Sequence, residues 1–320
     1  MNIENMPKIE LHCHLDGSVR KETIKEILGF EGDITDKVIA KEKCESLKEY
    51  LTMFDLPLKC MQTKENIVRI TFELFEDMAN ENVKYAEVRF APRLHMEEGL
   101  DYQDIIESVI EGIKKAEKKY DIKGNIIIIA MRHEDVEKSI EVVENSKIYL
   151  GTKVIAFDLA GNEADFPPYI HEKAINLAKG YGYRITLHAG EAGDKHNILD
   201  AIELGAERIG HGIAAKDDYH LRDLIKHHNI SLEVCPTSNY QTKAVDKYEH
   251  HPIKMFLNEG IRVTVNTDNR TVSDINLTRE YKKLVEKLSM TDDELYELYL
   301  NSVEASFCDE KTKKELLRKW

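Results

Sequence analysis

The stretch of the chain with the clearest chemical potential is IELHCHLDGS at residues 9–18, where one residue separates two histidines. Side chains of a β-strand alternate between its two faces, so His12 and His14 are expected to lie on one face. Two imidazoles close together near a strand end can bind a metal ion, although an HxH pair alone also occurs by accident on wet surfaces. The residues that the fold brings beside them decide between these interpretations.

Further imidazoles and carboxylates occur in short motifs along the chain: His188 and Glu191 in LHAGE, His211 in GHG and Asp268 in NTD. Imidazoles combined with a carboxylate are ligands typical of Zn²⁺ or a related divalent ion. A bound zinc lowers the pKa of water from about 15.7 to about 7, which supplies hydroxide at neutral pH. Each residue alone has an ordinary explanation, as a solvated acid, a turn residue or a helix cap. Their joint placement at predicted strand ends favours a metal site.

The sequence predicts eight strands, and the residues named above lie at the ends of several of them. Short apolar runs bounded by turn residues predict strands at Lys8–His14, Lys84–Ala91, Asn125–Arg132, Val154–Gly161, Arg184–Gly190, Arg208–Gly212, Ser231–Thr237 and Arg262–Asp268. Helical periodicity between them predicts helices at Asp104–Lys119, Val136–Leu150, Tyr169–Tyr181, His196–Leu204, Asp217–His227 and Ile253–Asn258. This alternation predicts an α/β fold, a (β/α)8 TIM barrel whose active residues lie at the C-terminal ends of the strands.

The connection after the first strand is too long for one crossover helix. Helices are predicted there over residues 22–30, 46–54 and 65–82, as an insertion at the barrel mouth. After Asp268, C-terminal helices are predicted over residues 274–288, 291–306 and 309–320. Because no linker, repeat or low-complexity segment interrupts the chain, we expect residues 1–320 to form one domain.

The composition, 42% hydrophobic and 32% charged residues, is that of a soluble globular protein. A net charge of −14 argues against a nucleic-acid partner, and the longest apolar run, IIIIAM at residues 126–131, is too short to cross a bilayer. The five cysteines form no CxxC pair and the first ten residues show no signal pattern, so we expect a cytoplasmic protein. The oligomeric state is not indicated.

Other known kinds of metal site are excluded because the sequence lacks their motifs. No HExxH motif occurs, and the cytidine-deaminase pattern fails because Cys235 precedes its proline and the second cysteine is missing. The predicted fourth strand ends without a lysine that could bridge two metals, so one metal is favoured. The remaining histidines are interpreted as surface residues: His95, His133, His171, His196, His220, His227, His228, His250 and His251.

Taken together, the motifs resemble those of the adenosine deaminases, a branch of the metal-dependent amidohydrolases. The resemblance rests on HCHLDGS at 12–18, DLAG at 158–161, LHAGE at 187–191, IGHG at 209–212 and NTD at 266–268. It implies one zinc ion per chain, bound by His12, His14, His188 and Asp268. It further implies that Glu191 protonates purine N1, while His211 and Asp268 orient the water-derived nucleophile that adds to C6. Glu191 must then hold a proton near neutral pH, which enclosure favours.

The substrate implied by the resemblance is a purine nucleoside, adenosine or 2′-deoxyadenosine, with contacts to His14, Asp16, Gly161 and Asn269. The backbone of Gly161 would meet N3, and Asp16 would accept a hydrogen bond from the ribose 5′-hydroxyl and repel a 5′-phosphate. Many members have a second acid where this chain has Asn269. An amide donates to N7 without being protonated, so we expect Asn269 to keep that contact and to alter pH dependence and ring preference.

The inserted segment SLKEYLTMF at 46–54 resembles an apolar lid over the nucleoside, formed by Leu47, Tyr50, Leu51 and Phe54. The buried face of an ordinary helix is an equally good interpretation. The nearest rival function keeps the chemistry and changes the substrate to adenine, aminofutalosine or a 5′-thio nucleoside. A nucleoside-binding barrel without catalysis, and a mononuclear amidohydrolase that cleaves a cyclic amide, are the other classes.

Overall fold

The computed structural model describes residues 2–191 and 194–320, and these contain an eight-stranded sheet. The strands pair in parallel in chain order, each with the next. They are β1 (Lys8–His14), β2 (Val83–Phe90), β3 (Lys123–Met131), β4 (Val154–Ala160), β5 (Arg184–Ala189), β6 (Arg208–His211), β7 (Ser231–Val234) and β8 (Val263–Val265). Chain-order parallel pairing requires a crossover after every strand, as the sequence predicted.

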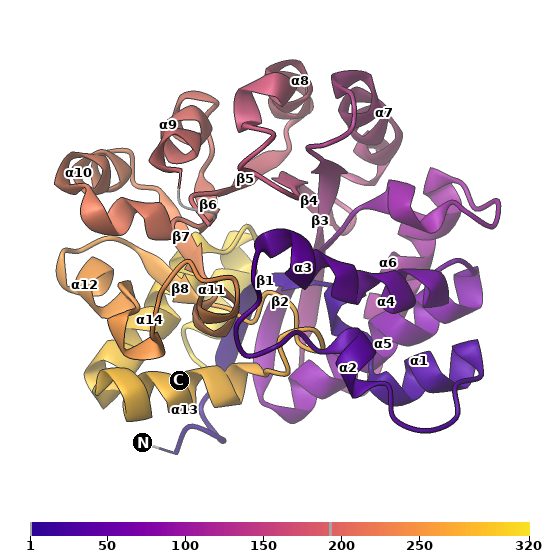
Figure 1. Ribbon diagram of the computed structural model, residues 1–320, viewed down its shortest axis with the longest axis horizontal. Coiled ribbons are helices and arrows are strands. Elements are labelled where there is room, and N and C mark those ends of the chain that lie inside the picture. Colours follow the sequence, from indigo (N-terminus) through magenta and orange to yellow (C-terminus); the bar gives the residue numbers. More distant parts are fainter. Residues whose placement is uncertain (1, 192–193) are drawn as a thin grey trace.

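The sheet closes on itself where the segment after β8 meets β1 (Figure 1). The His14 backbone N–H donates to the Asp268 carbonyl at 2.7 Å, and the Asp268 N–H donates to the His12 carbonyl at 2.9 Å. Cys13 and Asp268 form a parallel bridge. Residues from opposite ends of the sequence thereby become neighbours at the barrel mouth, and the predicted TIM barrel is confirmed.

Amphipathic helices surround the barrel (Figure 1). The crossover helices are α5 (Lys64–Asn80), α6 (Tyr102–Lys119), α7 (Val136–Ser146), α8 (Glu172–Tyr181), α9 (Lys195–Glu203), α10 (Tyr219–His227) and α12 (Ile253–Asn258). In α6, Asp101 caps the first turn by accepting from the Asp104 N–H at 2.8 Å. Ile105, Val109 and Ile113, spaced by four residues, are buried on the side that faces the sheet.

The insertion between β1 and β2 is helical, as predicted. Before α5 it contains α1 (Lys21–Leu28), α2 (Thr35–Val38), α3 (Leu47–Leu51) and α4 (Asp55–Cys60). The predicted helix over residues 46–54 is in fact α3 followed by a 3₁₀ turn, η2 (Thr52–Phe54). Figure 1 shows α3 in front of the strands near the centre of the barrel, with α4 beside it toward the outer helices. The insertion therefore forms part of the wall of the barrel mouth.

The C-terminal helices are α13 (Leu277–Leu288), α14 (Asp292–Ala305) and α15 (Glu310–Leu316), with α14 packed against β8 and β1. Two predicted strand ends are wrong. The strand predicted to reach Asp268 ends at Val265. The strand predicted to reach Thr237 ends at Val234, because Pro236 opens a short helix, α11 (Pro236–Gln241). Proline has no N–H for a sheet ladder but fits the first turn of a helix.

Three of the histidines interpreted as surface residues are buried. His171 places Nδ1 2.8 Å from Ser139 Oγ, and His251 places Nε2 3.2 Å from Asn239 Oδ1. His95 has no exposure and packs beside an aromatic ring. The helical and loop context of the sequence hid this burial, because a histidine with local polar neighbours looks the same whether it faces solvent or a neighbouring element.

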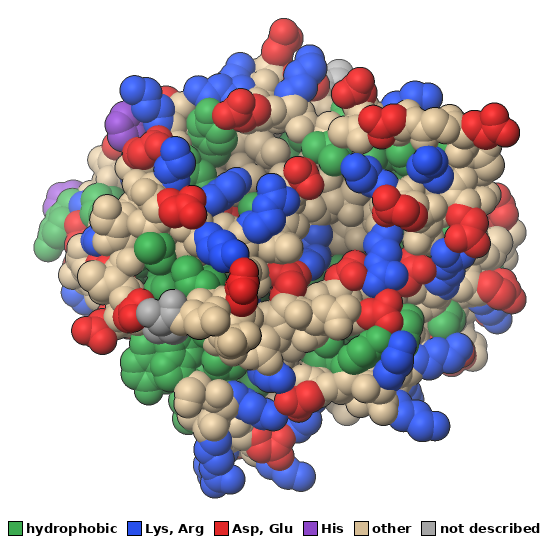
Figure 2. Space-filling model, turned by 90° about the horizontal axis from the view of Figure 1, so that it is seen from below, with side chains coloured by type: hydrophobic (Ala, Val, Ile, Leu, Met, Phe, Trp, Pro, Cys, Tyr) green, Lys and Arg blue, Asp and Glu red, His purple; other side chains and the backbone are tan. Residues whose placement is uncertain are grey.

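Within the described residues, no helix combines the length and the hydropathy that crossing a bilayer requires. Figure 2 shows one face of the molecule on which acidic and basic side chains are interspersed. The Lys/Arg side chains there are separated by Asp/Glu side chains instead of forming one continuous basic surface.

Candidate active site

A cavity of about 440 Å³ opens at the C-terminal mouth of the barrel. All of the predicted site residues except His12 line it: His14, Asp16, Gly161, His188, Glu191, His211, Asp268 and Asn269. His12 has no solvent exposure and lies behind the cavity, with its ring 4.6 Å from that of His188. The structure thus brings every predicted site residue to one place.

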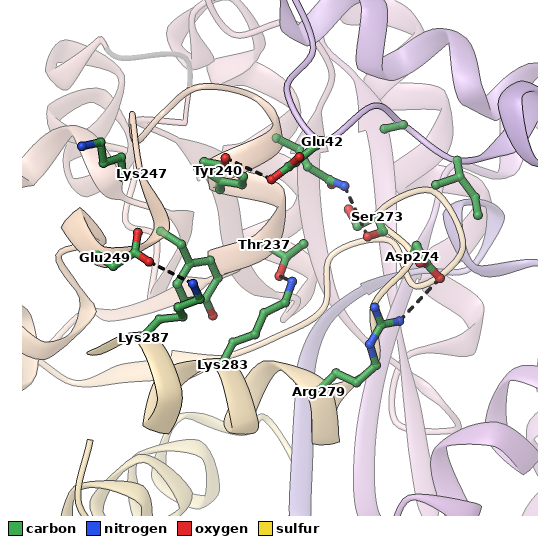
Figure 3. A pocket seen from close by; sticks show the side chains of 14 residues that line it. Glu42, Thr237, Tyr240, Lys247, Glu249, Ser273, Asp274, Arg279, Lys283 and Lys287 are labelled. Atoms are coloured by element: carbon green, nitrogen blue, oxygen red, sulfur yellow. Dashed lines mark hydrogen bonds and ion pairs between the residues drawn. The ribbon is translucent and has the colours of Figure 1, made fainter. Parts of the chain in front are cut away.

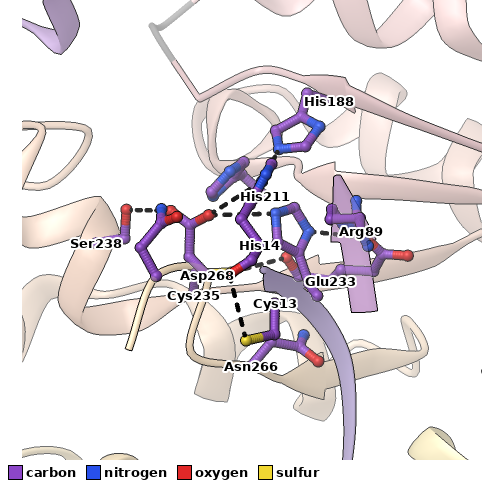
Figure 4. A network of polar contacts seen from close by, with 12 residues as sticks. Cys13, His14, Arg89, His188, His211, Glu233, Cys235, Ser238, Asn266 and Asp268 are labelled. Carbon is purple, nitrogen blue, oxygen red and sulfur yellow. Dashed lines mark hydrogen bonds and ion pairs between the residues drawn. The ribbon is translucent and has the colours of Figure 1, made fainter. Parts of the chain in front are cut away.

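Two of the histidines are oriented from behind by buried carboxylates (Figure 4). His12 Nδ1 lies 2.8 Å from Glu233 Oε2, and His188 Nδ1 lies 2.9 Å from Asp158 Oδ2. Because the carboxylates accept, Nδ1 carries the ring proton and Nε2 presents its lone pair toward the cavity. Among residues 2–191 and 194–320, nothing hydrogen-bonds the buried His12 Nε2. A buried lone pair held in this way is suited to a metal ion.

His14 and Asp268 approach the same point. His14 Nε2 lies 3.2 Å from His188 Nε2 and 3.5 Å from Asp268 Oδ1, which is also 3.5 Å from His12 Nε2. Ser238 Oγ donates to Asp268 Oδ2 at 2.6 Å, and this bond leaves Oδ1 facing the imidazoles. Three imidazole nitrogens and a carboxylate oxygen therefore converge with spacings that a coordinated cation requires.

One group of potential ligand atoms in the described chain lies within 4.8 Å of one another, and it comprises His12, His188, His211 and Asp268. The tautomer of His211 separates it from the other two histidines. Asn239 Oδ1 accepts from the Cys235 N–H at 3.4 Å, so the Asn239 amide N–H₂ faces His211 Nδ1 at 3.0 Å. His211 Nδ1 therefore accepts, and Nε2 carries the proton 3.6 Å from Glu191 Oε2. A protonated nitrogen donates instead of coordinating.

Glu191 is only 8% exposed. Burial, together with the negative charges of Asp268 and Glu163, raises the pKa of Glu191 well above its ordinary value. Glu163 also accepts the Gly190 N–H at 2.7 Å and so fixes the backbone just before Glu191. A carboxyl group in this environment keeps its proton near neutral pH and can act as an acid.

The other titratable groups are shifted in the direction that metal binding needs. Burial lowers the pKa values of His14, His188 and His211, which keeps their rings neutral. For Asp268, burial opposes ionisation, but the surrounding histidines outweigh it and lower the pKa. His12 differs, because its interactions with the Asp268 and Glu233 carboxylates outweigh burial and the charge of Arg89 and raise its pKa. An ionised carboxylate beside neutral imidazoles is the form that binds divalent metals.

Asp16 and Gly161 lie on two sides of the same cavity. Asp16 follows β1 and is 5% exposed, and burial raises the pKa of its carboxyl to about 6. Gly161 follows β4 with φ at +111°, which a side chain rarely tolerates. A Cβ at Gly161 would also approach Arg132 Cγ to 3.3 Å. The glycine therefore keeps a stretch of backbone open to whatever occupies the cavity.

The inserted segment supplies an apolar wall formed by Leu47, Leu51 and Phe54, which line the cavity with Tyr50. Tyr50 departs from the prediction of a purely apolar lid residue. It is 2% exposed, and its hydroxyl lies 2.7 Å from Ser273 Oγ and accepts from the Asn269 amide at 3.0 Å. Asn269 is itself 2% exposed, so this polar contact is buried at the cavity wall.

Sequence reasoning missed the charged layer beneath the site. Arg89 has no exposure and donates at 2.7 Å both to Asp158 and to Glu233, the carboxylates that orient His188 and His12 (Figure 4). Asp158 was part of a quoted motif but had no assigned role. The available signal was a charged residue inside a strand of a parallel barrel, where both faces are buried and a charge needs a partner.

A second cavity, of about 410 Å³, is lined in part by Thr237, Tyr240 and Gln241 of α11 (Figure 3). Its cations are largely paired, since Lys283 donates to Thr237 at 3.0 Å and Lys287 donates to Glu249 at 3.1 Å. None of the predicted site residues lines it. The predicted site residues therefore gather at the barrel mouth and not in this second cavity.

Comparison with protein families agrees with this geometry, because the adenosine deaminase family model matches residues 7–319. The chain belongs to the adenosine deaminase family. An adenosine deaminase from Clostridium botulinum (strain Okra / Type B1) is 52% identical over 328 residues, which cover 99% of this chain and 97% of that protein. An adenosine deaminase from Clostridium perfringens (strain 13 / Type A) is 48% identical, with coverages of 99% and 98%.

Among solved structures, the adenine deaminase from Arthrobacter aurescens superposes with a TM-score of 0.91 at 26% identity and covers 98% of each chain. This adenosine deaminase family member therefore shares its barrel with an enzyme named for a different purine. The membership establishes a metal-dependent hydrolase. The assignment of particular residues to metal and substrate rests on the geometry described above.

Proposed function

We propose that the chain hydrolyses adenosine and 2′-deoxyadenosine to inosine and deoxyinosine, with release of ammonia. One observation supports this above all. A carboxyl group that keeps its proton, an imidazole N–H and an ionised carboxylate converge on one cavity, in Glu191, His211 and Asp268. Hydrolysis at C6 of a 6-aminopurine requires an acid for the ring, a donor to the attacking oxygen and a base for the water proton.

The proposed cofactor is one zinc ion per chain, held by His12, His14, His188 and Asp268. The outward-facing Nε2 atoms of His12 and His188 support this set, and the proton on His211 Nε2 argues against His211 as a ligand. Nitrogen ligands with one carboxylate suit zinc better than magnesium or calcium. When bound, zinc lowers the pKa of a water molecule to about 7 and polarises it for attack.

The residues divide the proton transfers among them. Glu191 gives its proton to N1, which draws electrons from the ring and makes C6 electrophilic. The Asp268 carboxylate accepts the proton that the attacking water loses, and His211 Nε2–H donates a hydrogen bond to the oxygen as it gains charge. That proton then passes to the amino group, the C6–N bond breaks and ammonia leaves. The remaining hydroxyl proton on the C6 oxygen returns to Glu191 as the C6=O group of inosine forms. Water and adenosine are thus converted to inosine and ammonia without a redox partner.

Substrate recognition is proposed to involve His14, Asp16, Gly161 and Asn269. The backbone at Gly161 meets N3, where the missing side chain permits close approach. Asp16 accepts from the 5′-hydroxyl, and at neutral pH its carboxylate repels a 5′-phosphate. Asn269 donates an amide N–H to N7, since N7 is an acceptor and the amide carries two such hydrogens.

The nearest rival is a deaminase of adenine or of another adenosine derivative. Its support is the shared barrel of the adenine deaminase and of an Arabidopsis N6-mAMP deaminase, which is 29% identical with a TM-score of 0.89 and covers 99% of this chain and 98% of that one. The buried carboxyl group of Asp16 argues against a phosphorylated substrate, because burying two like charges together is costly. The cytoplasmic location and the single domain stay predictions.

Product analysis tests the proposal. Purified protein loaded with zinc is incubated in parallel with adenosine, 2′-deoxyadenosine, adenine, AMP, aminofutalosine and a 5′-thio nucleoside, and inosine-type products and ammonia are quantified. We expect equimolar inosine and ammonia from adenosine, with turnover of AMP and adenine lower by at least about a hundredfold. Preferential conversion of adenine or of one of the derivatives would replace the assigned substrate. No ammonia from any member of the panel would remove the proposed function.

A further inference from the structure

Tyr50, in the inserted segment, makes hydrogen bonds in the polar part of the site. It lies on α3, yet its hydroxyl contacts two residues of the segment after β8, Ser273 at 2.7 Å and Asn269 at 3.0 Å. Ser238 also interacts with this hydroxyl, and Ser238 donates to Asp268. The phenol thus connects the insertion to three residues around the proposed catalytic centre.

Hydrogen-bond chemistry fixes how the Asn269 amide is oriented. Burial raises the pKa of Tyr50 well above its ordinary value, so the hydroxyl keeps its proton. The proton of Ser238 is committed to the Asp268 carboxylate, so Ser238 Oγ can only accept from its other neighbours. The Tyr50 hydroxyl can therefore donate its proton to a serine oxygen. Its own oxygen then accepts a hydrogen bond from Asn269, so the amide N–H₂ of Asn269 faces Tyr50.

The opposite side of the Asn269 amide is constrained by Gly17. A Cβ at Gly17 would lie 1.9 Å from Asn269 Oδ1 and 2.6 Å from Asn269 Cγ, so the amide packs directly on the glycine backbone. Oδ1 has no hydrogen-bond partner within the described part of the chain. Tyr50 is therefore the side chain to which the Asn269 amide is hydrogen-bonded in that part, and removing its hydroxyl would free the amide to rotate.

We propose that Tyr50 is a specificity-determining positioning residue, whose hydroxyl holds the Asn269 amide so that its second N–H faces the purine. This inference rests on the proposed function, in which Asn269 donates to N7. The inference adds that the orientation of the Asn269 N–H donor is fixed by a residue of the inserted segment, about 220 residues away in sequence. A ligand with an acceptor at ring position 7 is then favoured over one with a C–H there.

The test compares two unreactive ligands, inosine and 7-deazainosine, as competitive inhibitors of the zinc-loaded full chain. They differ only in N against C–H at position 7, so the ratio of their inhibition constants isolates that contact. We expect wild type to prefer inosine by about tenfold, the effect of one hydrogen bond. In Tyr50→Phe the ratio of inhibition constants should fall below about threefold. Without the Tyr50 hydroxyl, the Asn269 amide can rotate and place either its oxygen or its N–H toward position 7.

Tyr183→Phe is the matched control. Tyr183 is also buried and its hydroxyl also lies against a serine, 2.6 Å from Ser146, but between α7 and β5, outside the cavity. The ratio of inhibition constants of Tyr183→Phe should equal that of wild type. In an Asn269→Ala background, where the ratio is already lost, adding Tyr50→Phe should change nothing further. A merely structural role of Tyr50 would alter the two inhibition constants together and leave their ratio unchanged.

The outcomes separate this inference from the proposed function. An active wild type without preference for inosine, or a Tyr50→Phe enzyme that keeps the wild-type ratio, overturns the role of Tyr50 and leaves the deaminase assignment intact. A wild type that produces no inosine from adenosine overturns the function itself. If Tyr50→Phe does not fold, Tyr50→Leu replaces it. That variant also removes the hydroxyl that accepts from Asn269, and an unchanged ratio there overturns the inference equally.

Discussion

The layer beneath the cavity and the wall beside it are built on different principles. Beneath the cavity, Arg89, Asp158 and Glu233 lie on strands and have no exposure, and Arg89 pairs with each of the two carboxylates at 2.7 Å. On the wall, α3 contributes apolar side chains and a single polar anchor, Tyr50. The first region holds the groups that perform chemistry, and the second decides which molecule reaches them. Damage to the first should change metal affinity and kcat, whereas damage to the second should change KM and ligand preference.

Metal removal gives the largest expected effect on the first region. Dialysis against a chelator should reduce deamination of adenosine to the background rate, and added Zn²⁺ should restore it, because nothing else in the proposed site makes water nucleophilic at neutral pH. Ammonia release and bound zinc are measured on the same samples. Full activity in a preparation shown to contain no metal would contradict the assignment.

Glu191→Gln should lower kcat by about 10²–10⁴-fold, because the amide fills the same space but has no acidic proton for N1. Zinc content and the inhibition constant of inosine should stay close to wild type. Steady-state kinetics and metal analysis check both. Wild-type turnover in this variant would contradict the assignment of Glu191 as the acid.

Arg89→Met should weaken zinc binding by about 10–100-fold, since the carboxylates that orient His12 and His188 lose their shared partner. It should also lower the free energy of unfolding by about 3–5 kcal/mol, because the buried Asp158 carboxylate loses its arginine partner and Glu233 keeps only its pair with Arg208. Chelator competition and urea denaturation measure the two effects. The matched control is Arg184→Met, which breaks a pair with Glu207 that is about half exposed and should cost at most about 1 kcal/mol.

Leu51→Ala should give the smallest effect, a rise in KM for adenosine of about 3–10-fold with little change in kcat or bound zinc. Leu51 lines the cavity wall formed by the inserted segment. Leu317→Ala, at a half-exposed C-terminal position, serves as the control. If Leu51→Ala lowered kcat as much as KM rises, the separation of the two regions would fail.

The positions of the site residues could be predicted because a barrel carries the C-terminal ends of its strands to one mouth. His12, His188 and Asp268 each end or follow a predicted strand, so their convergence needed only the strand count. The end of β7 was wrong because the proline at position 236 starts a helix instead of continuing a strand. Three buried histidines were missed, since burial depends on neighbours that local sequence does not show.

The polar role of Tyr50 could not be predicted for the same reason. In the sequence it occupies an apolar position of an amphipathic segment, and only the fold places its hydroxyl beside Asn269 and Ser273. The pairing of Arg89 with Glu233 is likewise invisible, as 144 residues separate them. A charged residue in a predicted strand signals that a partner exists, but its identity depends on which strands meet inside the barrel.

The sequence by itself determined the order of strands and helices and the kinds of chemical group at the strand ends, because these follow from local periodicity and residue type. The tertiary structure alone decided which nitrogen of each histidine faces the cavity, which carboxyl group keeps its proton and which hydroxyl holds the Asn269 amide. Protonation and hydrogen-bond direction depend on burial and on partners brought together from distant parts of the chain. Those arise only when the barrel closes.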